Sequence, residues 1–351
     1  MPALRDAHLT VRRGGCLQCS MQERWLLQCR PGFEAECAAE SGGEAIAEGV
    51  VEAPGPGAPL LRRVFARQAF RQLAALQELP AGGRIDPILR ALAAEPGPVH
   101  AILLEHPDTE AGKELANFLK RFTPALTSAL AKRGLPVFRK VPRRLHLLFT
   151  DSAHVRLGFS SGDEGSPLAN GILRLKMPPA APSRSTLKLE EALLTFLDAA
   201  ESEAVLKPGL RAVDLGAAPG GWTWQMVRHS IRVTAVDNGP MHPALMDSGL
   251  VDHRREDGFR YRPGKPVDWL LCDMVEQPLR IAALMGDWLI RGDCRRALFN
   301  LKLPMKRRWE SLQDCLGILQ GRLDEAGLRY SLLCKQLYHD REEVTAYIAL
   351  H

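Results

Sequence analysis

The sequence has no long apolar run and no complete set of metal-binding cysteines. None of its hydrophobic stretches approaches the ~20 residues that a membrane-spanning helix needs. The N-terminus carries no apolar segment of the kind found in secretory signals. Of the eight cysteines, only Cys16 and Cys19 are spaced like metal ligands, and no second pair completes a site. We therefore expect reduced thiols, no bound metal, no membrane partner and a cytoplasmic location.

The sequence also has no internal repeat, no low-complexity segment and no extreme composition. It has 351 residues, of which 46% are hydrophobic and 25% are charged, as in ordinary globular proteins. This length suffices for two or three domains. The formal net charge is +5 and the pI is about 8.8, which is compatible with an anionic partner such as nucleic acid but does not require one.

The G-x-G-x-x-G motif, with which dinucleotide-binding folds seat a pyrophosphate, is missing as well. In its place, an apolar run leads into DLGAAPGG, residues 214–221, and a tryptophan-rich helix start follows. Strand, glycine turn and helix in this order open a nucleotide-binding βαβ unit. Asp237 ends the next apolar run, ~20 residues further on, where an acidic side chain can hold a ribose hydroxyl.

This loop favours a ligand without phosphate, because Asp214 before the glycines would repel one. S-adenosylmethionine, which carries a positive sulfonium and an adenosine, fits such a loop. Glycines let the backbone approach a ligand closely. The alternative is a glycine turn that closes the unit and binds nothing. We predict that the donor is held by Gly216, Ala218, Pro219, Gly220 and Gly221.

From residue 185 to the end, helices and strands alternate. This pattern predicts an α/β fold with a mostly parallel, Rossmann-like sheet, in which the last strand closes a hairpin and runs antiparallel. Ser185 is placed to cap the first helix. The predicted helices are 185–203, 278–290 and 310–326, and the main strands are 211–215, 232–237, 267–274 and 297–303, before a closing pair.

The N-terminal half reads as an α+β module of shorter elements. It divides into segments 21–80 and 81–177, and the proline-rich stretch 178–184 is the best candidate for a linker. Single strands are expected at 45–52 and at GILRLK, residues 171–176. Residues 1–20 look detached, either as an extension upstream of a natural start at Met21 or as a disordered native tail.

Two groups of basic residues mark this half as a candidate RNA-binding module. One lies among phenylalanines, and the other flanks the strand LHLLF. Basic and aromatic side chains together suit phosphate contact and base stacking. The alternative is an ordinary solvated basic face. The predicted RNA-binding residues are Arg62, Arg63, Arg67, Lys140, Arg143 and Arg144.

Acidic residues follow several strands, at the edge where doubly wound sheets bind ligands. Asp257 could meet an adenine amino group or could simply shape a turn. Cys272 could be the nucleophile of a cytosine-methylating enzyme, but its place before Asp273 points it into the core. Lys188, Lys302 and Glu343 could converge with Asp273 at one rim. The alternative is salt bridging at the ends of elements.

These motifs resemble, in order, those of the FtsJ-type RNA ribose 2′-O-methyltransferases. The matching segments are SRSTLKLEEA, VDLGAAPGGWT, CDM, FNLKLP and REEVTAYI. CRPGFEAECAAE, FARQ and LYHDREEVT are similar to a bacterial group of this family that modifies large-subunit ribosomal RNA, from about Leu26 to the end. The chain departs from that group at Ala218, where a cysteine is expected, in the N-terminal extension and in an early end at His351.

The resemblance implies a ferredoxin-like segment at 21–80, a THUMP RNA-binding domain at 81–177 and a methyltransferase domain at 185–351. It implies S-adenosylmethionine as donor and the ribose 2′-hydroxyl of a 23S rRNA cytidine near the peptidyl-transferase centre as acceptor. A monomer acting on naked or early precursor rRNA is expected. By motif, Lys302 would accept the proton, with Lys188, Asp273 and Glu343 around it. The donor would contact Ser185, residues 218–221, Asp237, Asp257 and Asp273.

Three other functions remain possible on sequence alone. The first is a cytosine base methyltransferase that uses Cys272. The second is an rRNA-binding assembly factor that keeps the fold without turnover. The third is a nicotinamide oxidoreductase, which the missing glycine motif disfavours.

Overall fold

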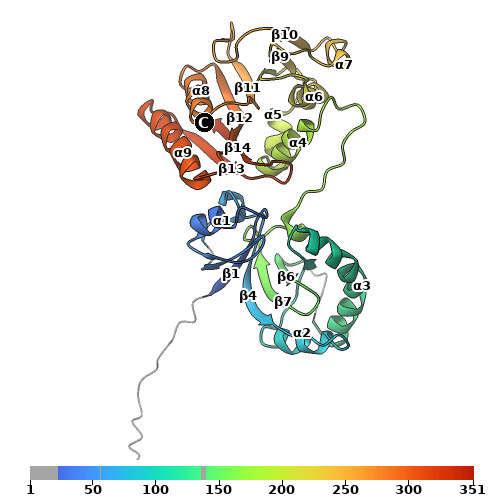
Figure 1. Cartoon of the computed structure of the whole chain (residues 1–351). Coiled ribbons are helices and arrows are strands. Elements are labelled where there is room, and N and C mark those ends of the chain that lie inside the picture. The colour runs from blue at the N-terminus through green and yellow to red at the C-terminus, as the bar shows by residue number, and fades with distance from the viewer. Residues whose placement is uncertain (1–22, 56, 136–139) are drawn as a thin grey trace, which may run out of the picture.

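The computed structural model describes residues 23–55, 57–135 and 140–351. The predicted extension at 1–20, with Cys16 and Cys19, lies outside the described residues. Two lobes are visible, each built on one seven-stranded sheet, and a long connection joins them (Figure 1). Within the described ranges, no helix is long and apolar enough to cross a membrane.

The N-terminal sheet has the order β2-β3-β1-β4-β7-β6-β5, and all its pairings are antiparallel except that of β5 with β6. Since β4 pairs with both β1 and β7, one unbroken sheet runs through the predicted segments 21–80 and 81–177. Helices α2 and α3 pack on it through residues such as Ile88 and Leu126. The elements are β1 (Arg24–Gln28), α1 (Glu34–Ser41), β2 (Glu44–Ala47), β3 (Val50–Pro54), η1 (Leu60–Arg62), β4 (Gln68–Leu76), α2 (Ile85–Leu92), β5 (Ala101–Glu105), α3 (Glu110–Lys132), β6 (Arg143–Phe149), β7 (Val155–Ser161) and η2 (Ala169–Gly171).

Two predicted strands of this lobe were wrong. The single strand expected at 45–52 is a hairpin of β2 and β3, because Gly49 adopts a positive φ of 71° and turns the chain. No strand forms at 171–176. The preceding strand, β7, is already paired with β4 and β6, and no pairing of residues 171–176 with a strand occurs after buried Ile172.

The C-terminal sheet has the order β10-β9-β8-β11-β12-β14-β13. It is parallel from β10 to β12, and β14 is inserted antiparallel between β12 and β13, which confirms the predicted Rossmann-like architecture. The elements are α4 (Ser185–Phe196), α5 (Ala199–Val205), β8 (Arg211–Leu215), α6 (Gly221–Arg228), β9 (Arg232–Val236), α7 (Pro243–Met246), β10 (Val251–Arg254), β11 (Val267–Cys272), α8 (Pro278–Ile290), β12 (Cys294–Lys302), α9 (Arg308–Glu325), β13 (Tyr330–Lys335) and β14 (Glu343–Leu350).

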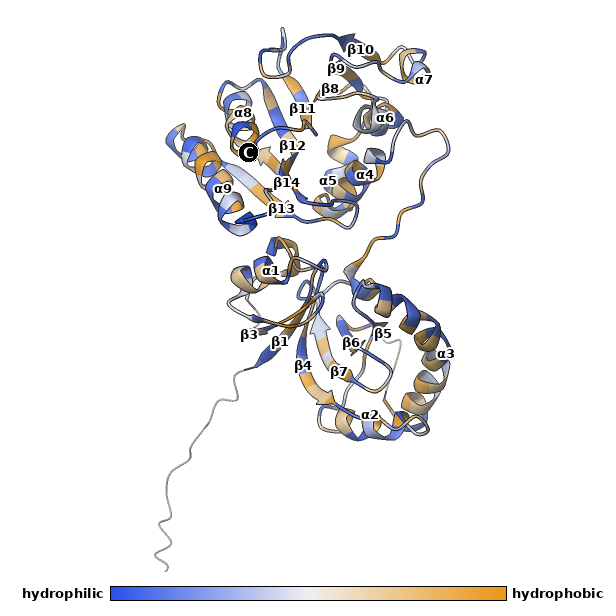
Figure 2. Cartoon of the chain, in the orientation of Figure 1, coloured by the Kyte–Doolittle hydropathy of each residue, from blue (hydrophilic) through white to orange (hydrophobic). Residues whose placement is uncertain are grey.

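Helix boundaries differ from the prediction at the start of this lobe. The helix expected over 185–203 is broken into α4 and α5, because the Asp198 side chain accepts a hydrogen bond from the Glu201 N–H and starts a new helix. Ser185 is the first residue of α4 rather than its cap. Figure 2 shows hydrophobic and hydrophilic residues mixed along α3 and α9, as expected of helices with one face on a sheet.

The two lobes share one apolar core. Phe33 stacks on Phe65, whose ring lies edge-on to Trp309 of α9, with centroids 6.0 and 6.1 Å apart. Beside them, the buried Lys335 Nζ donates to the carbonyls of three residues of the N-terminal lobe, at 2.7–2.9 Å: Leu60, Arg63 and Ala66. Burial lowers the pKa of Lys335 to about 8, although Glu40 opposes the shift.

We predict that Lys335→Met lowers the free energy of unfolding by roughly 2–4 kcal/mol, because three carbonyls lose their donor. The loss should grow as the pH rises from about 8 towards ~10.4. In that window the unfolded lysine binds more protons than the folded one, so the wild type gains stability. Urea unfolding at several pH values measures this. Lys265→Met, at an exposed position, is the control, and an equal loss there would contradict the role of Lys335.

Candidate active site

Four charged side chains meet where the parallel strands end. Asp273 follows β11, Lys302 ends β12, Glu343 opens β14 and Lys188 lies on α4. Lys302 and Glu343 are register partners in the β12–β14 pair. These elements lie together in the C-terminal lobe (Figure 1). The convergence expected from sequence therefore exists, and the four residues are referred to below as the tetrad.

Asp273 is the centre of the tetrad. Its Oδ1 lies 2.5 Å from Lys302 Nζ, which also lies 3.3 Å from the Asp273 carbonyl. Its Oδ2 lies 3.8 Å from Lys188 Nζ, and Lys188 in turn donates to Glu343. Two ammonium groups and two carboxylates thus alternate along one edge. All four side chains are partly or largely buried.

The two lysines have different environments. Burial alone would lower the pKa of Lys188, but the carboxylates of Asp273 and Glu343 outweigh it, and the pKa is raised. Lys188 therefore stays charged at neutral pH. Lys302 forms an ion pair with Asp273, and among the described residues it forms none with Glu343.

A buried polar chain behind Asp273 was not anticipated from sequence. Asn300 Nδ2 donates to Asp273 Oδ1 at 2.9 Å, and Thr345 Oγ1 lies 2.7 Å from Asn300 Oδ1. Thr345 Oγ1 also lies 3.0 and 3.2 Å from the carboxyl oxygens of Asp340. Strand alternation could have indicated it. Asn300 is two residues before Lys302 and Thr345 is two after Glu343, so each points to the same face of the sheet as its tetrad neighbour.

The glycine turn lies beside the tetrad and is fixed by Asp237. The Asp237 carboxylate accepts from the backbone N–H groups of Ala218, at 3.0 Å, and Gly239, at 2.7 Å. A Cβ on Gly221 would lie 2.1 Å from Ser185 Oγ, so α4 packs directly on the turn. Ser185, the glycine turn and Asp237 therefore lie side by side, and their contact with a donor stays a prediction.

Asp214 and Asp257, both expected at the ligand-binding edge, have different surroundings in the structure. Asp214 is buried rather than facing the ligand edge, and it accepts from Thr223 Oγ1 at 2.7 Å. Burial raises its pKa to about 7, so it supplies no constant negative charge to the turn. Asp257 is exposed and accepts from the Phe259 N–H at 2.9 Å, as a turn aspartate does. Its contact with a ligand stays a prediction.

Cys272 belongs to the core, as strand alternation predicted. Its side chain is buried, and burial raises the pKa of its thiol to about 12. A thiolate is the nucleophilic form of cysteine, and it is disfavoured here. This argues against a covalent mechanism through Cys272.

Most of the predicted RNA-binding arginines are buried or form contacts within the protein. Arg63 and Arg67 are each 5% exposed. Arg144 is also buried and bonds to Ser160 and the Gly162 carbonyl. Arg143 is paired with Glu95 and lies over the ring of Phe159. The hypothesis that Arg63, Arg67 and Arg144 contact phosphates conflicts with their burial, whereas Arg62 and Lys140 are exposed and keep that prediction.

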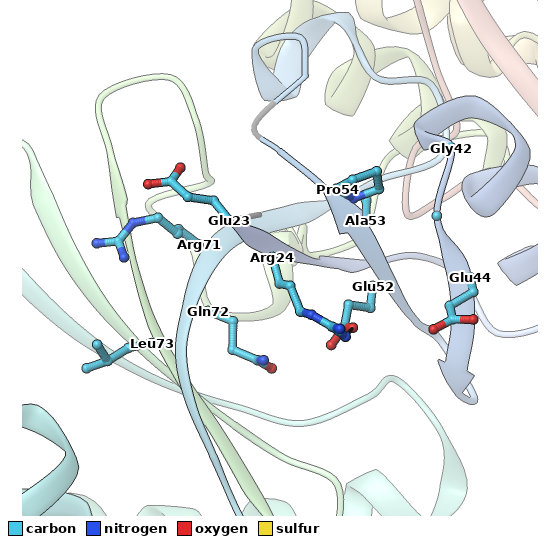
Figure 3. A pocket seen from close by; sticks show the side chains of 11 residues that line it. Glu23, Arg24, Gly42, Glu44, Glu52, Ala53, Pro54, Arg71, Gln72 and Leu73 are labelled. Carbon is cyan, nitrogen blue, oxygen red and sulfur yellow. Dashed lines mark hydrogen bonds and ion pairs between the residues drawn. The ribbon is translucent and has the colours of Figure 1, made fainter. Parts of the chain in front are cut away.

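A separate hollow of about 740 Å³ lies on the N-terminal sheet (Figure 3). Its lining has mixed charge. Arg24 pairs with Glu52, and Arg71 pairs with Glu95. Glu23 and Glu44 add further acid to the lining. A surface with this balance does not attract a polyanion.

Two family models match parts of this chain. Residues 181–285 match the family model described as FtsJ-like methyltransferase. Residues 83–161 match the model described as Ribosomal RNA large subunit methyltransferase M, N-terminal.

Full-length relatives carry the same name. The protein called Ribosomal RNA large subunit methyltransferase M in Alkalilimnicola ehrlichii is 49% identical over 339 residues, which cover 92% of this chain and 93% of that protein. Its namesake in Methylococcus capsulatus is 48% identical over 347 residues, covering 93% and 97%.

The two solved structures described next are remotely similar to this chain. TrmN from Thermus thermophilus has 17% sequence identity and a TM-score of 0.32, covering 93% of this chain and 99% of its own. Fibrillarin from Aeropyrum pernix, solved with S-adenosyl-L-methionine, has 18% identity and a TM-score of 0.34, covering 58% and 81%.

We predict that Gly221→Ala destabilises the protein by roughly 1–3 kcal/mol, because its methyl group would overlap Ser185 Oγ and push α4 from the turn. Thermal unfolding measures the effect. Gly264→Ala is the matched control, since a Cβ there meets nothing within 4 Å. Equal stability of the two variants would show that the turn and α4 are not in close contact.

Proposed function

The chain belongs to the family of ribosomal RNA large subunit methyltransferase M, and from this premise we propose that it methylates the ribose 2′-hydroxyl of a cytidine in 23S rRNA, near the peptidyl-transferase centre. S-adenosylmethionine is the methyl donor. The single observation that carries the chemistry is the contact of Lys302 with Asp273 beside the glycine turn. We further propose that a monomer acts on naked or early precursor rRNA in the cytoplasm, with a THUMP module in the N-terminal lobe.

The residues around the turn fit this donor. Asp237 keeps lone pairs for ribose hydroxyls while it orders the turn. A Cβ on Gly216 would lie 2.6 Å from Met274 Cγ. The absence of a side chain at Gly216 therefore lets the backbone of the turn approach Met274 closely. No positive side chain lies among residues 214–221, which suits a cationic sulfonium better than a phosphate. Ser185, Asp257 and Asp273 complete the proposed donor contacts.

When bound, S-adenosylmethionine supplies an activated methyl group on a sulfonium. The chemistry that it would supply is transfer of this methyl group to the ribose oxygen, with the thioether as leaving group. The protein must hold the ribose oxygen in line with the methyl group, which is a large part of catalysis. It must also withdraw the hydroxyl proton, because a neutral hydroxyl is a poor nucleophile.

Lys302 is the group that we assign to this proton. Of the two lysines, Lys188 is bound to Glu343 and held in its charged form, so it cannot accept a proton. Lys302 has one close carboxylate, Asp273, which orients the amine. Lys302 takes the hydroxyl proton in its neutral form, and Asp273 stabilises the ammonium that results. In this division Lys188 and Glu343 fix Asp273 from the other side.

Two strongly exposed apolar side chains flank the tetrad and suit the target base. Val275, two residues after Asp273, is 89% exposed, and Met305, three after Lys302, is 82% exposed. Lys306 and Arg307 follow and are exposed as well. We assign Val275 and Met305 to the nucleobase and the two cations to neighbouring phosphates.

Lys302 can be tested by two substitutions. We expect Lys302→Ala to lower kcat by roughly 10²–10⁴, with donor affinity unchanged, since only proton withdrawal is lost. Lys302→Arg should be equally impaired, because a guanidinium cannot be deprotonated in proteins. Methyl transfer to 23S rRNA and titration of donor binding are measured separately. Activity retained by the arginine variant would mean that Lys302 positions the hydroxyl by its charge instead.

The product distinguishes the competing functions. A 2′-O-methyl group blocks alkaline cleavage at one nucleotide, whereas a base methyl does not. Mapping that nucleotide in rRNA of a deletion strain and its parent identifies the target. A purified protein that binds no donor would support the assembly factor.

We expect Met305→Ser to lower kcat/KM for rRNA about tenfold, since burying a methionine side chain contributes roughly 1.5–3 kcal/mol. Donor affinity should not change. Ile318→Ser, at an exposed apolar position on α9, is the control. An rRNA kcat/KM equal to that of the control would remove Met305 from the acceptor site.

A further inference from the structure

Asp340 is a buried acid that no step above uses. It lies between β13 and β14, three residues before Glu343, and it is 1% exposed. Its Oδ2 accepts from the Leu337 N–H at 3.0 Å, and both carboxyl oxygens lie near Thr345 Oγ1. No salt bridge to its carboxyl group occurs among the described residues.

The donor and the acceptor of each hydrogen bond between Asp273 and Asp340 can be derived by counting protons. The Asp273 carboxylate only accepts hydrogen bonds, so Asn300 must turn its Nδ2 towards it. Asn300 Oδ1 then faces Thr345 and needs a donor, and the Thr345 hydroxyl is the donor within reach, at 2.7 Å. The single hydroxyl proton of Thr345 is therefore committed to Asn300.

The contact between Thr345 and Asp340 then needs a second proton. The oxygens are 3.0 and 3.2 Å apart, and two buried acceptors at that distance would repel each other. A proton on Asp340 Oδ1 resolves this. Oδ1 then donates to Thr345 Oγ1, while Oδ2 still accepts from the Leu337 N–H.

We infer that Asp340 is an un-ionised carboxylic acid in the folded protein and a positioning residue for the tetrad. Its proton sets the direction of the hydrogen bonds through Thr345 and Asn300, and so holds the Asn300 amide against Asp273. With Asp340 ionised, Thr345 would turn to Asp340, Asn300 would lose its donor, and Asp273 would lose a fixed partner beside Lys302. The effect on activity rests on the proposed function, but the protonation state does not.

The surroundings of Asp340 favour the neutral form. Burial raises the pKa of Asp340 well above its ordinary value, and the charges of Glu343 and Glu191 act in the same direction. The Leu337 N–H and Lys188 oppose the shift and are outweighed. Arg30 donates to the backbone carbonyl of Asp340, at 2.7 Å, rather than to its carboxyl group.

The protonation state is tested on the whole protein by infrared spectroscopy and by stability. We expect a carboxylic acid C=O band at neutral pH that Asp340→Asn weakens, while the contribution of Asp214, whose pKa is about 7, remains in both proteins. The unfolded acid ionises near pH ~3.9 while the folded one does not, so the wild type loses stability as the pH rises above that value. Asp340→Asn should therefore become increasingly more stable than the wild type over this range, and exposed Asp247→Asn should not. A band that Asp340→Asn leaves unchanged, together with a pH-independent difference, would overturn the inference.

Positioning is tested by methyl transfer. Asp340→Leu and Thr345→Val should each lower kcat on the order of ten- to a hundredfold, with donor affinity unchanged, because Asp273 loses its orientation. Asp340→Asn, which can donate as the neutral acid does, and Thr345→Ser should rescue most of that loss. An asparagine variant as impaired as the leucine variant would show that the ionised form is required. Failure of the proposed function is distinct, since the wild type would then transfer no methyl group to rRNA.

Discussion

The carboxylate of Asp273 is the constraint around which the C-terminal lobe is arranged. It receives one ammonium from the neighbouring parallel strand and lies near a second from α4. A carboxylate with these partners is stable at a sheet edge only if each partner is held in turn. Glu343 holds Lys188, and Asn300 holds Asp273 from behind. The charged edge and the buried polar chain are therefore one network, in which removing a member takes a partner away from its neighbours.

The N-terminal lobe supports this network from outside the methyltransferase sheet. The loop at 336–342 leads from β13 into Glu343 and carries Asp340. Arg30 donates to the carbonyl of Tyr338 at 3.3 Å as well as to that of Asp340. On the other side of the loop, Glu191 of α4 accepts from the N–H groups of Tyr338 and His339. The loop is thus held between the two lobes, and so is the strand end that presents Glu343.

Much of this arrangement could be predicted from the sequence, because the apolar periodicity of strands and the residues that form turns are visible within short segments. The glycine turn, the parallel strands and the antiparallel last strand follow from alternation and spacing. The edge residues follow from the rule that parallel strands end together. Long-range context decided the rest. The pattern around Arg63 and Arg67 resembles a basic surface, but both side chains are buried, and Arg67 donates to the Leu337 carbonyl of the second lobe. Asp340 gave no signal, because Asn300, which links Thr345 and Asp340 to the tetrad, lies 45 positions from Thr345 on another strand.

The contact between Lys188 and Glu343 joins residues that are 155 positions apart in the sequence. Closing so long a loop costs chain entropy before the contact contributes anything, so such contacts form late in folding. The glycine turn and Asp237, by contrast, are local to the first strands of the lobe. A partly folded chain could therefore possess the donor surface before β14 inserts and completes the charged edge. The polypeptide would then acquire the ability to bind the donor in one folding step and the ability to transfer the methyl group in a later one.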